Sequence, residues 1–337
     1  MPSPLRWGVL GAARIAINRV IPGMRGSVLA RVDAIAARDL ARAQAAAAAL
    51  GIARAYGSYE TLLADPEIDV VYVALPNHLH AEWAIRAAEA GKHVLCEKPL
   101  ALSAAEARTI VEARDRTGVR VQEAFMVRTH PQWERAVSLC REGTLGDVCA
   151  YNGTFSFFND RPADIRNIAA FGGGGIMDIG CYLVMTSRLV FGASPVRVVS
   201  DLRIDPTAGV DTLASMILEY PAGAHATGMC STLLGPQQRV QIFGTRARLE
   251  IEIPFNAPPD RPCRLWLDDG RDVFGGGRQE ILLPVCNQYR LQADRFSESI
   301  LDGSPQPYAL EESLANLEVI DAIFRSNESR GWERVGT

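Results

Sequence analysis

The sequence predicts an α/β protein of two domains. The first is a doubly wound parallel sheet. The second is α+β, with a mainly antiparallel sheet. Short apolar runs alternate with helical patterns in the first third of the chain, whereas strand-like runs follow one another later. The 337 residues suffice for two domains, which we place at residues 1–124 and 125–337.

The first part alternates regularly. Strands are expected at 5–10, 31–36, 69–75, 93–96 and 119–124, as short apolar runs. Helices are expected at 14–24, 40–50, 78–90 and from Ser103 to Gly118, where Glu106 completes a capping box with Ser103. In a parallel sheet of this kind, ligands bind at the carboxyl ends of the strands.

The pattern changes near residue 150. Strands are expected at 151–158, 196–204, 213–220, 225–230, 239–243 and 248–253. A polar loop that ends in glycines, 159–175, precedes a helix at 176–190, and two helices close the chain at 289–301 and 310–326.

Composition excludes several classes of protein. The formal net charge of -4 gives no basic surface for nucleic acid. The seven cysteines form no CxxC pair, which argues against a disulfide framework or a metal site and favours a reducing compartment. With no basic, apolar leader and no apolar run of about 18 residues, we expect a cytoplasmic protein that does not insert in a membrane.

Lysine is rare in this chain. Of the 35 lysines and arginines, only Lys92 and Lys98 are lysines. Lysine is a compact charge with a tunable pKa, unlike the planar guanidinium of arginine. We therefore single out Lys98, and treat Lys92 as a generic positive charge left by drift.

The first strand leads into a degenerate dinucleotide fingerprint. Gly11-x-Ala13-x-x-Ala16 follows the strand and opens a helix, so small residues let the backbone approach a pyrophosphate at the helix N-terminus. Alanine at the second glycine position weakens the match, and such a motif is often only a tight turn. Its place in the first βα unit favours the functional interpretation.

The end of the second strand indicates the cofactor. An NAD site places an acid there, but this strand ends Ala36-Ala37-Arg38, and a guanidinium would pair with a 2′-phosphate. We infer NADP over NAD. Asp39 leaves dual specificity open, and a solvated arginine is the competing interpretation. At the end of the next long strand, Asn77 and His80 are candidates for cofactor contact, although His80 could equally be a helix-start histidine bonded to backbone.

Four segments resemble one family when they are taken together. GVLGAARIA at 8–16, LPNHLHAEWA at 75–84, AGKHVLCEKPL at 90–100 and GGGGIMDIGCY at 172–182 are similar to the glucose–fructose oxidoreductase/inositol dehydrogenase (Gfo/Idh/MocA) family. The resemblance covers essentially the whole chain. It implies an N-terminal Rossmann domain and a C-terminal domain with a large open sheet that packs in a homodimer or homotetramer.

The resemblance also implies site residues. Lys98 of the Glu-Lys-Pro run, Asp178 and Tyr182 would form the catalytic set. Tyrosine at 182, the run Glu123 to Arg128 and Arg166 resemble the branch with NADP-dependent xylose dehydrogenase and dihydrodiol dehydrogenase. The expected cofactor contacts are Gly11, Ala12, Ala13, Arg14, Ile15, Ala37, Arg38, Leu75, Pro76, Asn77, His80, Glu97 and Lys98. The expected substrate contacts are Arg128, Phe158, Arg166, Asp178 and Tyr182, with His130, Asn159 and Asp164 as further pocket candidates.

These residues suit hydride transfer to or from a sugar or polyol. The Lys98 ammonium would favour the Tyr182 phenolate and steady an alkoxide. Asp178, four residues before Tyr182, would share its helix face, although a surface acid and a core tyrosine have the same spacing. The glycine run is expected to let backbone pass close to a bound ring. An NAD-dependent glycosidase and a dinucleotide-sensing module are the alternative functions.

Overall fold

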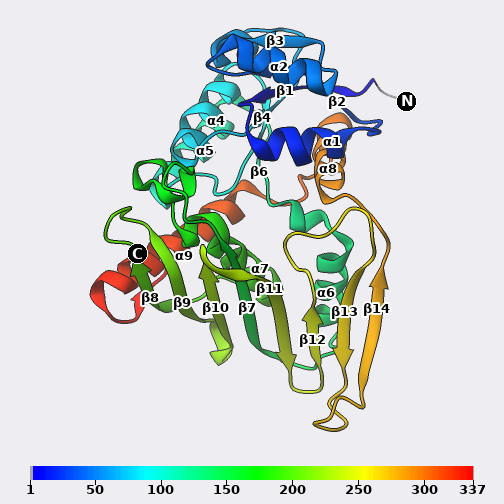
Figure 1. The fold of residues 1–337 in the computed structure, drawn as a ribbon. Helices are drawn as coiled ribbons and strands as arrows, with labels where there is room; N and C mark the ends of the chain where they lie inside the picture. The colour runs from blue at the N-terminus through cyan, green and yellow to red at the C-terminus, as the bar shows by residue number, and fades with distance from the viewer. Residues whose placement is uncertain (1–2, 337) are drawn as a thin grey trace. The chain divides into compact units, whose positions relative to one another are not determined.

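The computed structural model describes residues 3–336, which form two compact units. The first contains residues up to Thr129 together with Asn287–Leu314, and the second contains His130–Cys286 together with the chain from Ala315 onward. Figure 1 traces the chain through both. Each unit is built around its own sheet.

The first unit holds a six-stranded parallel sheet in the order β3-β2-β1-β4-β5-β6. This is the strand order of dinucleotide-binding Rossmann sheets. The expected parallel sheet is confirmed, and β3 is an additional strand that the sequence patterns missed. The strands are β1 (Leu5–Leu10), β2 (Ala30–Ala36), β3 (Arg54–Tyr56), β4 (Val70–Val73), β5 (His93–Cys96) and β6 (Val121–Glu123).

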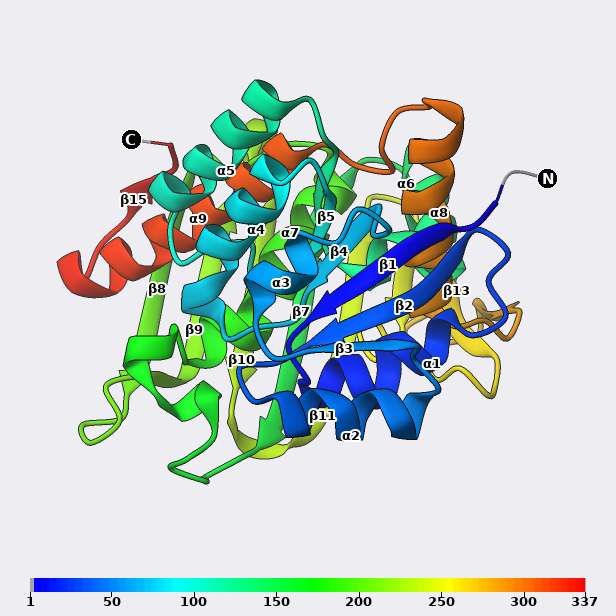
Figure 2. The ribbon, with the colours of Figure 1, turned by 90° about the horizontal axis from the view of Figure 1, so that it is seen from above.

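Helices cover both faces of this sheet, as Figure 2 shows. Ser58 and Ser103 accept hydrogen bonds from the first turns of α3 and α5, and Gly118 ends α5 in the left-handed conformation. The π-helical turn Ala16–Val20 leads into α1. The helices are α1 (Ile21–Met24), α2 (Leu40–Leu50), α3 (Tyr59–Leu63), α4 (His80–Glu89), α5 (Ala104–Thr117) and α8 (Gln288–Asp302).

Helix α8 returns to the first unit from late in the sequence. Its Phe296 is fully buried and meets the ring of Trp7 edge to face at 6.0 Å. The structure therefore differs from the expected division at 124/125, because residues 125–129 and 287–314 pack with the dinucleotide-type sheet. The driving force is burial of the α8 apolar face, which extends the core of the first unit.

The second unit holds a mainly antiparallel nine-stranded sheet in the order β14-β13-β12-β11-β7-β10-β9-β8-β15. Only β7 and β10 pair in parallel among its described strands. The expected antiparallel character is confirmed. The strands are β7 (Val148–Phe158), β8 (Arg197–Ile204), β9 (Asp211–Glu219), β10 (His225–Ser231), β11 (Leu233–Gly244), β12 (Arg248–Ile251), β13 (Cys263–Asp268), β14 (Arg278–Leu283) and β15 (Glu333–Arg334).

Helices α6 (Pro131–Arg141), α7 (Cys181–Phe191) and α9 (Leu310–Ser329) accompany this sheet. Helix α7 is preceded by a π-helical turn, Ile176–Gly180, and is buried on nearly all sides. One helical stretch of the described chain, Ala169–Phe191, is long and apolar enough to cross a membrane by length and composition. Because 67% of its most apolar window is buried within the structure, it has the character of a core helix.

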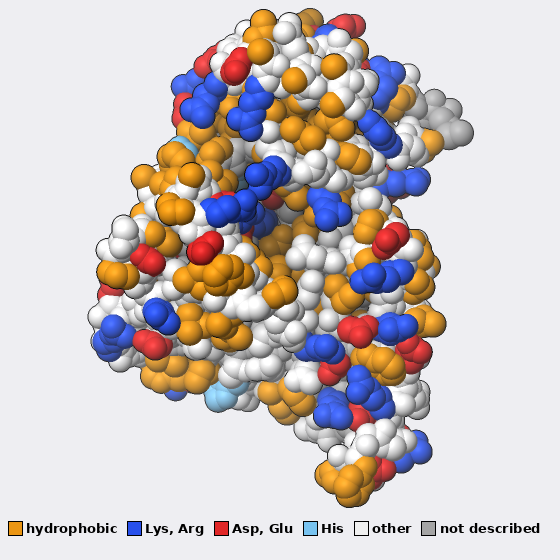
Figure 3. Space-filling view, viewed as in Figure 1, with side chains coloured by type: hydrophobic (Ala, Val, Ile, Leu, Met, Phe, Trp, Pro, Cys, Tyr) orange, Lys and Arg blue, Asp and Glu red, His pale blue; other side chains and the backbone are white. Residues whose placement is uncertain are grey.

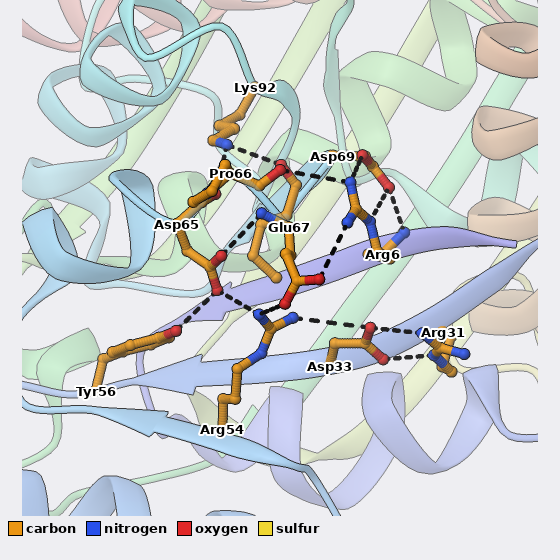
Figure 4. Close-up of polar contacts among 11 residues, drawn as sticks. Arg6, Arg31, Asp33, Arg54, Tyr56, Asp65, Pro66, Glu67, Asp69 and Lys92 are labelled. Carbon is orange, nitrogen blue, oxygen red and sulfur yellow. Dashed lines mark hydrogen bonds and ion pairs between the residues drawn. The ribbon is translucent and has the colours of Figure 1, made fainter.

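The amino ends of the first unit's strands carry an ion-pair network, which Figure 4 shows. Arg6 bonds to Asp69 at 2.7 Å, and Arg54 bonds to Asp65 at 2.8 Å. Lys92 is only 8% exposed, and its Nζ donates to the carbonyl oxygens of Asp65 (2.7 Å) and Ile68 (2.8 Å). The interpretation of Lys92 as a generic positive charge left by drift was therefore wrong, since its buried ammonium donates to two carbonyl oxygens.

Candidate active site

The predicted cofactor residues of the first unit gather at the opposite edge of the same sheet. Gly11 follows β1, Arg38 follows β2, Asn77 follows β4 and Lys98 follows β5. Because the strands are parallel, all four positions lie at carboxyl ends, where this architecture binds ligands.

The turn after β1 is built around Gly11. Its φ of 101° is open to glycine, and a Cβ there would lie 2.4 Å from the carbonyl oxygen of Ala74. Ala12 is buried, Ala13 and Ile15 are half-buried, and Arg14 at the start of the helix is exposed. Small residues followed at once by a helix start fit a bound pyrophosphate.

Two arginines flank this turn from the second βα unit. Arg38 is exposed just after β2 and the buried Ala37, and Arg42 of α2 donates from Nη2 to the carbonyl oxygen of Ala12 at 3.0 Å. Burial raises the pKa of Tyr59, and the positive charges of Arg38 and Arg42 partly offset that rise. The Asp39 carboxylate caps α2 by accepting from the amide of Ala41 at 2.9 Å. The acid next to Arg38 thus has a structural partner of its own.

His80 has a structural role that differs from the expected cofactor contact. The ring is 1% exposed, and its nitrogens lie 2.7 Å from the Pro99 carbonyl oxygen and 2.8 Å from that of Leu75. Both ring nitrogens are therefore engaged by backbone, as the alternative interpretation held. Burial is the main cause that lowers the pKa of His80. His80 ties the segment after β4, with Leu75 and Pro76, to the segment after Lys98.

The Glu97-Lys98 pair lies at the end of β5. The Tyr72 hydroxyl on β4 donates to Oε1 of Glu97, and the Lys98 amide donates to its Oε2 at 3.3 Å. Burial, followed by the charge of Glu97, raises the pKa of Tyr72 well above 10. Lys98 itself is half-buried, and its bond to Pro99 is cis. The Glu97 carboxylate thus anchors the start of the Glu-Lys-Pro segment to the neighbouring strand.

The second unit brings Asp178 and Arg166 together. Nε of Arg166 donates to Oδ2 of Asp178 at 2.7 Å, and Nη1 donates to Oδ1 of Asp164 at 3.3 Å. The Asp178 charge is the first cause that raises the pKa of Arg166. Asp164 also caps the short helix Ile165–Asn167, and Asn159 accepts from Nε of Arg161 at 3.2 Å. Two of the expected substrate residues therefore form one charged cluster.

The glycine run is explained by Asp211, a residue that sequence reasoning missed. The Asp211 carboxylate accepts from the amide of Ile176 at 2.7 Å and caps the helix that carries Asp178 and Tyr182. A Cβ at Gly174, where φ is 112°, would lie 2.1 Å from Oδ1 of Asp211. A Cβ at Gly173 would lie 2.4 Å from the Arg166 carbonyl oxygen. The run thus lets the chain pass its own capping residue, which is a different reason from the expected approach to a bound ring.

Tyr182 lies in an aromatic cluster. Its ring centroid is 5.8 Å from that of Phe155 in an edge-to-face arrangement and 5.4 Å from that of Phe255. Phe255 also stacks on Trp133 with centroids 6.5 Å apart. With Tyr182 only 5% exposed, this cluster fixes the ring.

The remaining candidates fall into different places. Phe158 is 62% exposed at the end of β7, whereas Arg128 belongs to the first unit and stacks over Tyr308 at 4.2 Å. His130 is 1% exposed; its Nδ1 accepts from Gln132 N, and its Nε2 lies 3.2 Å from the sulfur of Cys286. Burial lowers the pKa of His130 to about 4. His130 was wrongly expected in a pocket wall, because it is a buried helix cap.

Comparison with known proteins decides the family. A model for an oxidoreductase family with an NAD-binding Rossmann fold matches residues 5–125, and a model for the GFO/IDH/MocA C-terminal domain matches residues 133–250. The chain belongs to the Gfo/Idh/MocA family. The resemblance read from its motifs is confirmed, and the protein is an oxidoreductase.

Relatives within the Gfo/Idh/MocA family cover nearly the whole chain. An uncharacterized oxidoreductase of Rhizobium meliloti, ORF334, is 48% identical over 331 residues, with 98% of this chain and 99% of that protein covered. D-xylose 1-dehydrogenase (NADP(+)) 2 of Haloferax volcanii is 41% identical over 327 residues, covering 96% and 98%.

A solved structure has the same fold. KijD10, a 3-ketoreductase from Actinomadura kijaniata in complex with NADP and TDP-benzene, has a TM-score of 0.89 and 29% identity, with 96% of this chain and 98% of that chain covered. Other KijD10 structures carry a replacement of one lysine or of one tyrosine.

Proposed function

We propose that this protein is an NADP(H)-dependent oxidoreductase that transfers hydride between nicotinamide and a sugar CH–OH or carbonyl group. The observation that carries the proposal is the carboxyl edge of the six-stranded sheet. There the Gly11 turn follows β1, Arg38 and Arg42 follow β2, and Lys98 follows β5 of one parallel sheet. The named activities of the Haloferax and Actinomadura relatives support the same class of reaction.

The preference for NADP rests on charge. Arg38 and Arg42 place two guanidinium groups beside the fingerprint turn, which suits a 2′-phosphate. One oxygen of the exposed Asp39 carboxylate caps α2, and dual specificity through this acid is the alternative. Arg38→Ala should lower kcat/KM with NADP+ while leaving that with NAD+ nearly unchanged. An equal ratio of the two values in wild type and variant would contradict the assignment.

Lys98, Tyr182 and Asp178 are proposed as the catalytic set. The nicotinamide supplies or accepts the hydride. Tyr182 exchanges the proton with the substrate oxygen, and the Lys98 ammonium stabilises negative charge on both oxygens. Arg166 donates to Asp178 and orients its carboxylate, so that it accepts a hydrogen bond from a substrate hydroxyl. In KijD10, the lysine and tyrosine that were replaced stand as far apart along the chain as Lys98 and Tyr182 do here.

The substrate is proposed to be a sugar or a polyol. Exposed Phe158 offers an aromatic face, and Arg166 and Arg128 offer guanidinium forks for hydroxyl groups. A panel of aldoses, polyols and vicinal diols with NADP+ and NAD+, followed at the nicotinamide absorbance, tests this assignment. Turnover of an aldose with NADP+ is the expected result.

Lys98→Met is the decisive variant. We expect kcat to fall by at least about two orders of magnitude, as for loss of one oxyanion donor, while NADPH still binds. Near-normal turnover in Lys98→Met would contradict the mechanism.

Release of free sugar without net NADPH would instead favour a glycosidase, and NADPH binding without turnover of any compound would favour a sensor. Tyr182→Phe should flatten the alkaline side of the pH–rate profile, and an unchanged profile would move the proton transfer to another group.

We further propose that the protein forms homodimers or homotetramers through the nine-stranded sheet, and that it acts in the cytoplasm, since all seven cysteines are free thiols. Figure 3 shows charged side chains of both signs over β12–β14 and apolar patches over the other strands. Ile217 on β9 is a large apolar side chain with 39% exposure. Ile217→Arg should reduce the mass measured by light scattering, and an unchanged mass would exclude this face.

A further inference from the structure

The last strand of the six-stranded sheet ends in a carboxyl group, Glu123, for which the reaction scheme has no role. Glu123 is 2% exposed. It stands opposite Cys96 in the β5–β6 register, so Glu97 and Lys98 leave the sheet directly beside it. A carboxyl group is costly to bury, which makes its presence at this position informative.

The Glu123 carboxyl is tied to the segment that follows Lys98. Its Oε1 accepts a hydrogen bond from the amide of Leu100 at 2.8 Å. Its Oε2 is buried and has no hydrogen-bond partner among the described residues. On the backbone side, the Tyr308 hydroxyl donates to the Glu123 carbonyl oxygen. The segment Lys98–Leu100 is thus bonded to Glu123 at one end and to His80, through Pro99, in its middle.

Two cations and two weakly acidic groups lie around Glu123. Arg128 and Lys98 are its cationic partners, and both favour its ionised form. The Cys96 thiol and the Tyr308 phenol are the two weakly acidic groups. Burial raises their pKa values, and the charge of Glu123 raises them further. Burial outweighs the two cations and raises the pKa of Glu123 to about 7.

A neutral amide would satisfy Leu100 as well as a carboxylate does. What the carboxylate adds is charge close to Lys98, which glutamine would lack. The neighbouring acid, Glu97, has a different task, since it receives the Tyr72 hydroxyl.

We propose that Glu123 is a positioning residue for Lys98, fixing the Lys98–Leu100 segment through the Leu100 amide and holding the ammonium charged through its own carboxylate. The inference rests on the proposed function only in giving Lys98 a catalytic task. The geometry that carries it is the hydrogen bond from the Leu100 amide to Glu123 and the β5–β6 register, which pairs Glu123 with Cys96, two residues before Lys98. Above neutral pH the carboxylate is ionised and favours the ammonium form of Lys98.

The scarcity of lysine allows a direct test. Reductive methylation with ¹³C-formaldehyde labels only Lys92, Lys98 and the terminal amine, because the chain has no other lysine. The methyl signals then report each amine's pKa by NMR titration in the full-length protein. Lys98→Arg assigns the Lys98 signal, and Glu112→Gln, an exposed site on α5, serves as the matched control.

In Glu123→Gln, we expect the Lys98 pKa to fall by about one unit, as for loss of a nearby opposite charge, with the Lys92 pKa unchanged. Wild type alone provides a second test, because its Lys98 signal should show an additional inflection near pH 7 from Glu123. An identical Lys98 pKa in Glu123→Gln and wild type, or no inflection near pH 7, would overturn the inference. Failure of the proposed function would appear in a separate experiment, as normal turnover in Lys98→Met. That result would not change the Lys98 titration in wild type and Glu123→Gln.

Discussion

The buried Glu123 carboxyl should make the wild-type protein lose stability as the pH rises. Its pKa is raised from 4.5 to about 7 in the folded state, whereas in the unfolded chain it returns to the ordinary value. A carboxyl with a raised folded pKa favours folding fully below pH 4.5, and this contribution disappears as the pH rises through 7. Glu123→Gln removes the titrating group while keeping an acceptor for the Leu100 amide.

The magnitude follows from the size of the rise. Each pKa unit corresponds to about 1.4 kcal/mol, so the rise from 4.5 to about 7 corresponds to about 3 kcal/mol between pH 4 and pH 8. We therefore expect the stability of Glu123→Gln relative to wild type to increase by that amount over this range. For a chain of this size, the difference in Tm should grow by roughly 5 °C.

To test this expectation, Tm is measured by calorimetry from pH 4 to pH 8 at constant ionic strength. The proteins compared are wild type, Glu123→Gln and the exposed-site control Glu112→Gln. Only the change with pH matters, since the substitution alters packing equally at every pH. Glu112→Gln should follow wild type throughout. If Glu123→Gln also runs parallel to wild type, the carboxyl is not buried as described, and the reasoning is refuted.

Three further predictions concern other parts of the molecule. Gly174→Ala should destabilise the second unit by about 3 kcal/mol or more, because it combines a φ of 112° with a contact of 2.1 Å to Asp211. Gly235→Ala, with open space around it, should be nearly neutral. Equal Tm values for the two variants would contradict the capping role of Asp211. Lys92→Arg should lower the free energy of unfolding by about 1–3 kcal/mol, since a guanidinium overfills the niche between two carbonyl oxygens. Urea unfolding measures this loss, with Arg31→Lys, at a side chain 62% exposed, as the control. An equally stable Lys92→Arg would restore the interpretation of a generic charge. Arg42→Ala should weaken NADPH binding about tenfold in calorimetric titration, because one charge-assisted contact is lost. Arg116→Ala on α5 should leave the Kd unchanged. An unaltered Kd in Arg42→Ala would place Arg42 outside the cofactor site.

Local patterns predicted the elements that have strong local signals. The strand at 93–96 and the helix opened by Ser103 are present because apolar runs and caps act over a few residues. Strand β3 escaped because Arg54–Tyr56 is three half-buried residues long. Helix α6 escaped because its N-cap is His130, whereas Ser, Thr, Asp and Asn are the usual signals. The return of α8 to the first unit depends on packing of Phe296 against Trp7, which no local pattern encodes.

The candidate site divides in the same way. Motifs placed Gly11, Arg38 and Lys98 at one edge of the sheet, because strand ends can be read from sequence. They gave no sign of Arg42 or Asp211, whose roles depend on reaching a main-chain atom far along the chain. The two histidines show the limit of residue type as evidence. His80 and His130 are chemically suited to a site, yet each is buried and engaged by its own unit's backbone or by Cys286.

The two lysines of this arginine-rich chain can now be compared on physical grounds. Lys92 occupies a buried niche in which a compact ammonium fits between two carbonyl oxygens, and burial lowers its pKa. Lys98 stands at the opposite edge of the same sheet, beside a buried carboxyl that favours its charged form. Arginine can replace lysine at a solvated surface, but it is too large for the first position, and at the second it would present a planar fork in place of a compact charge. Each of the two lysines therefore stands where a compact charge is favoured over a guanidinium, and at Lys98 we propose that the Glu123 carboxylate favours the charged form.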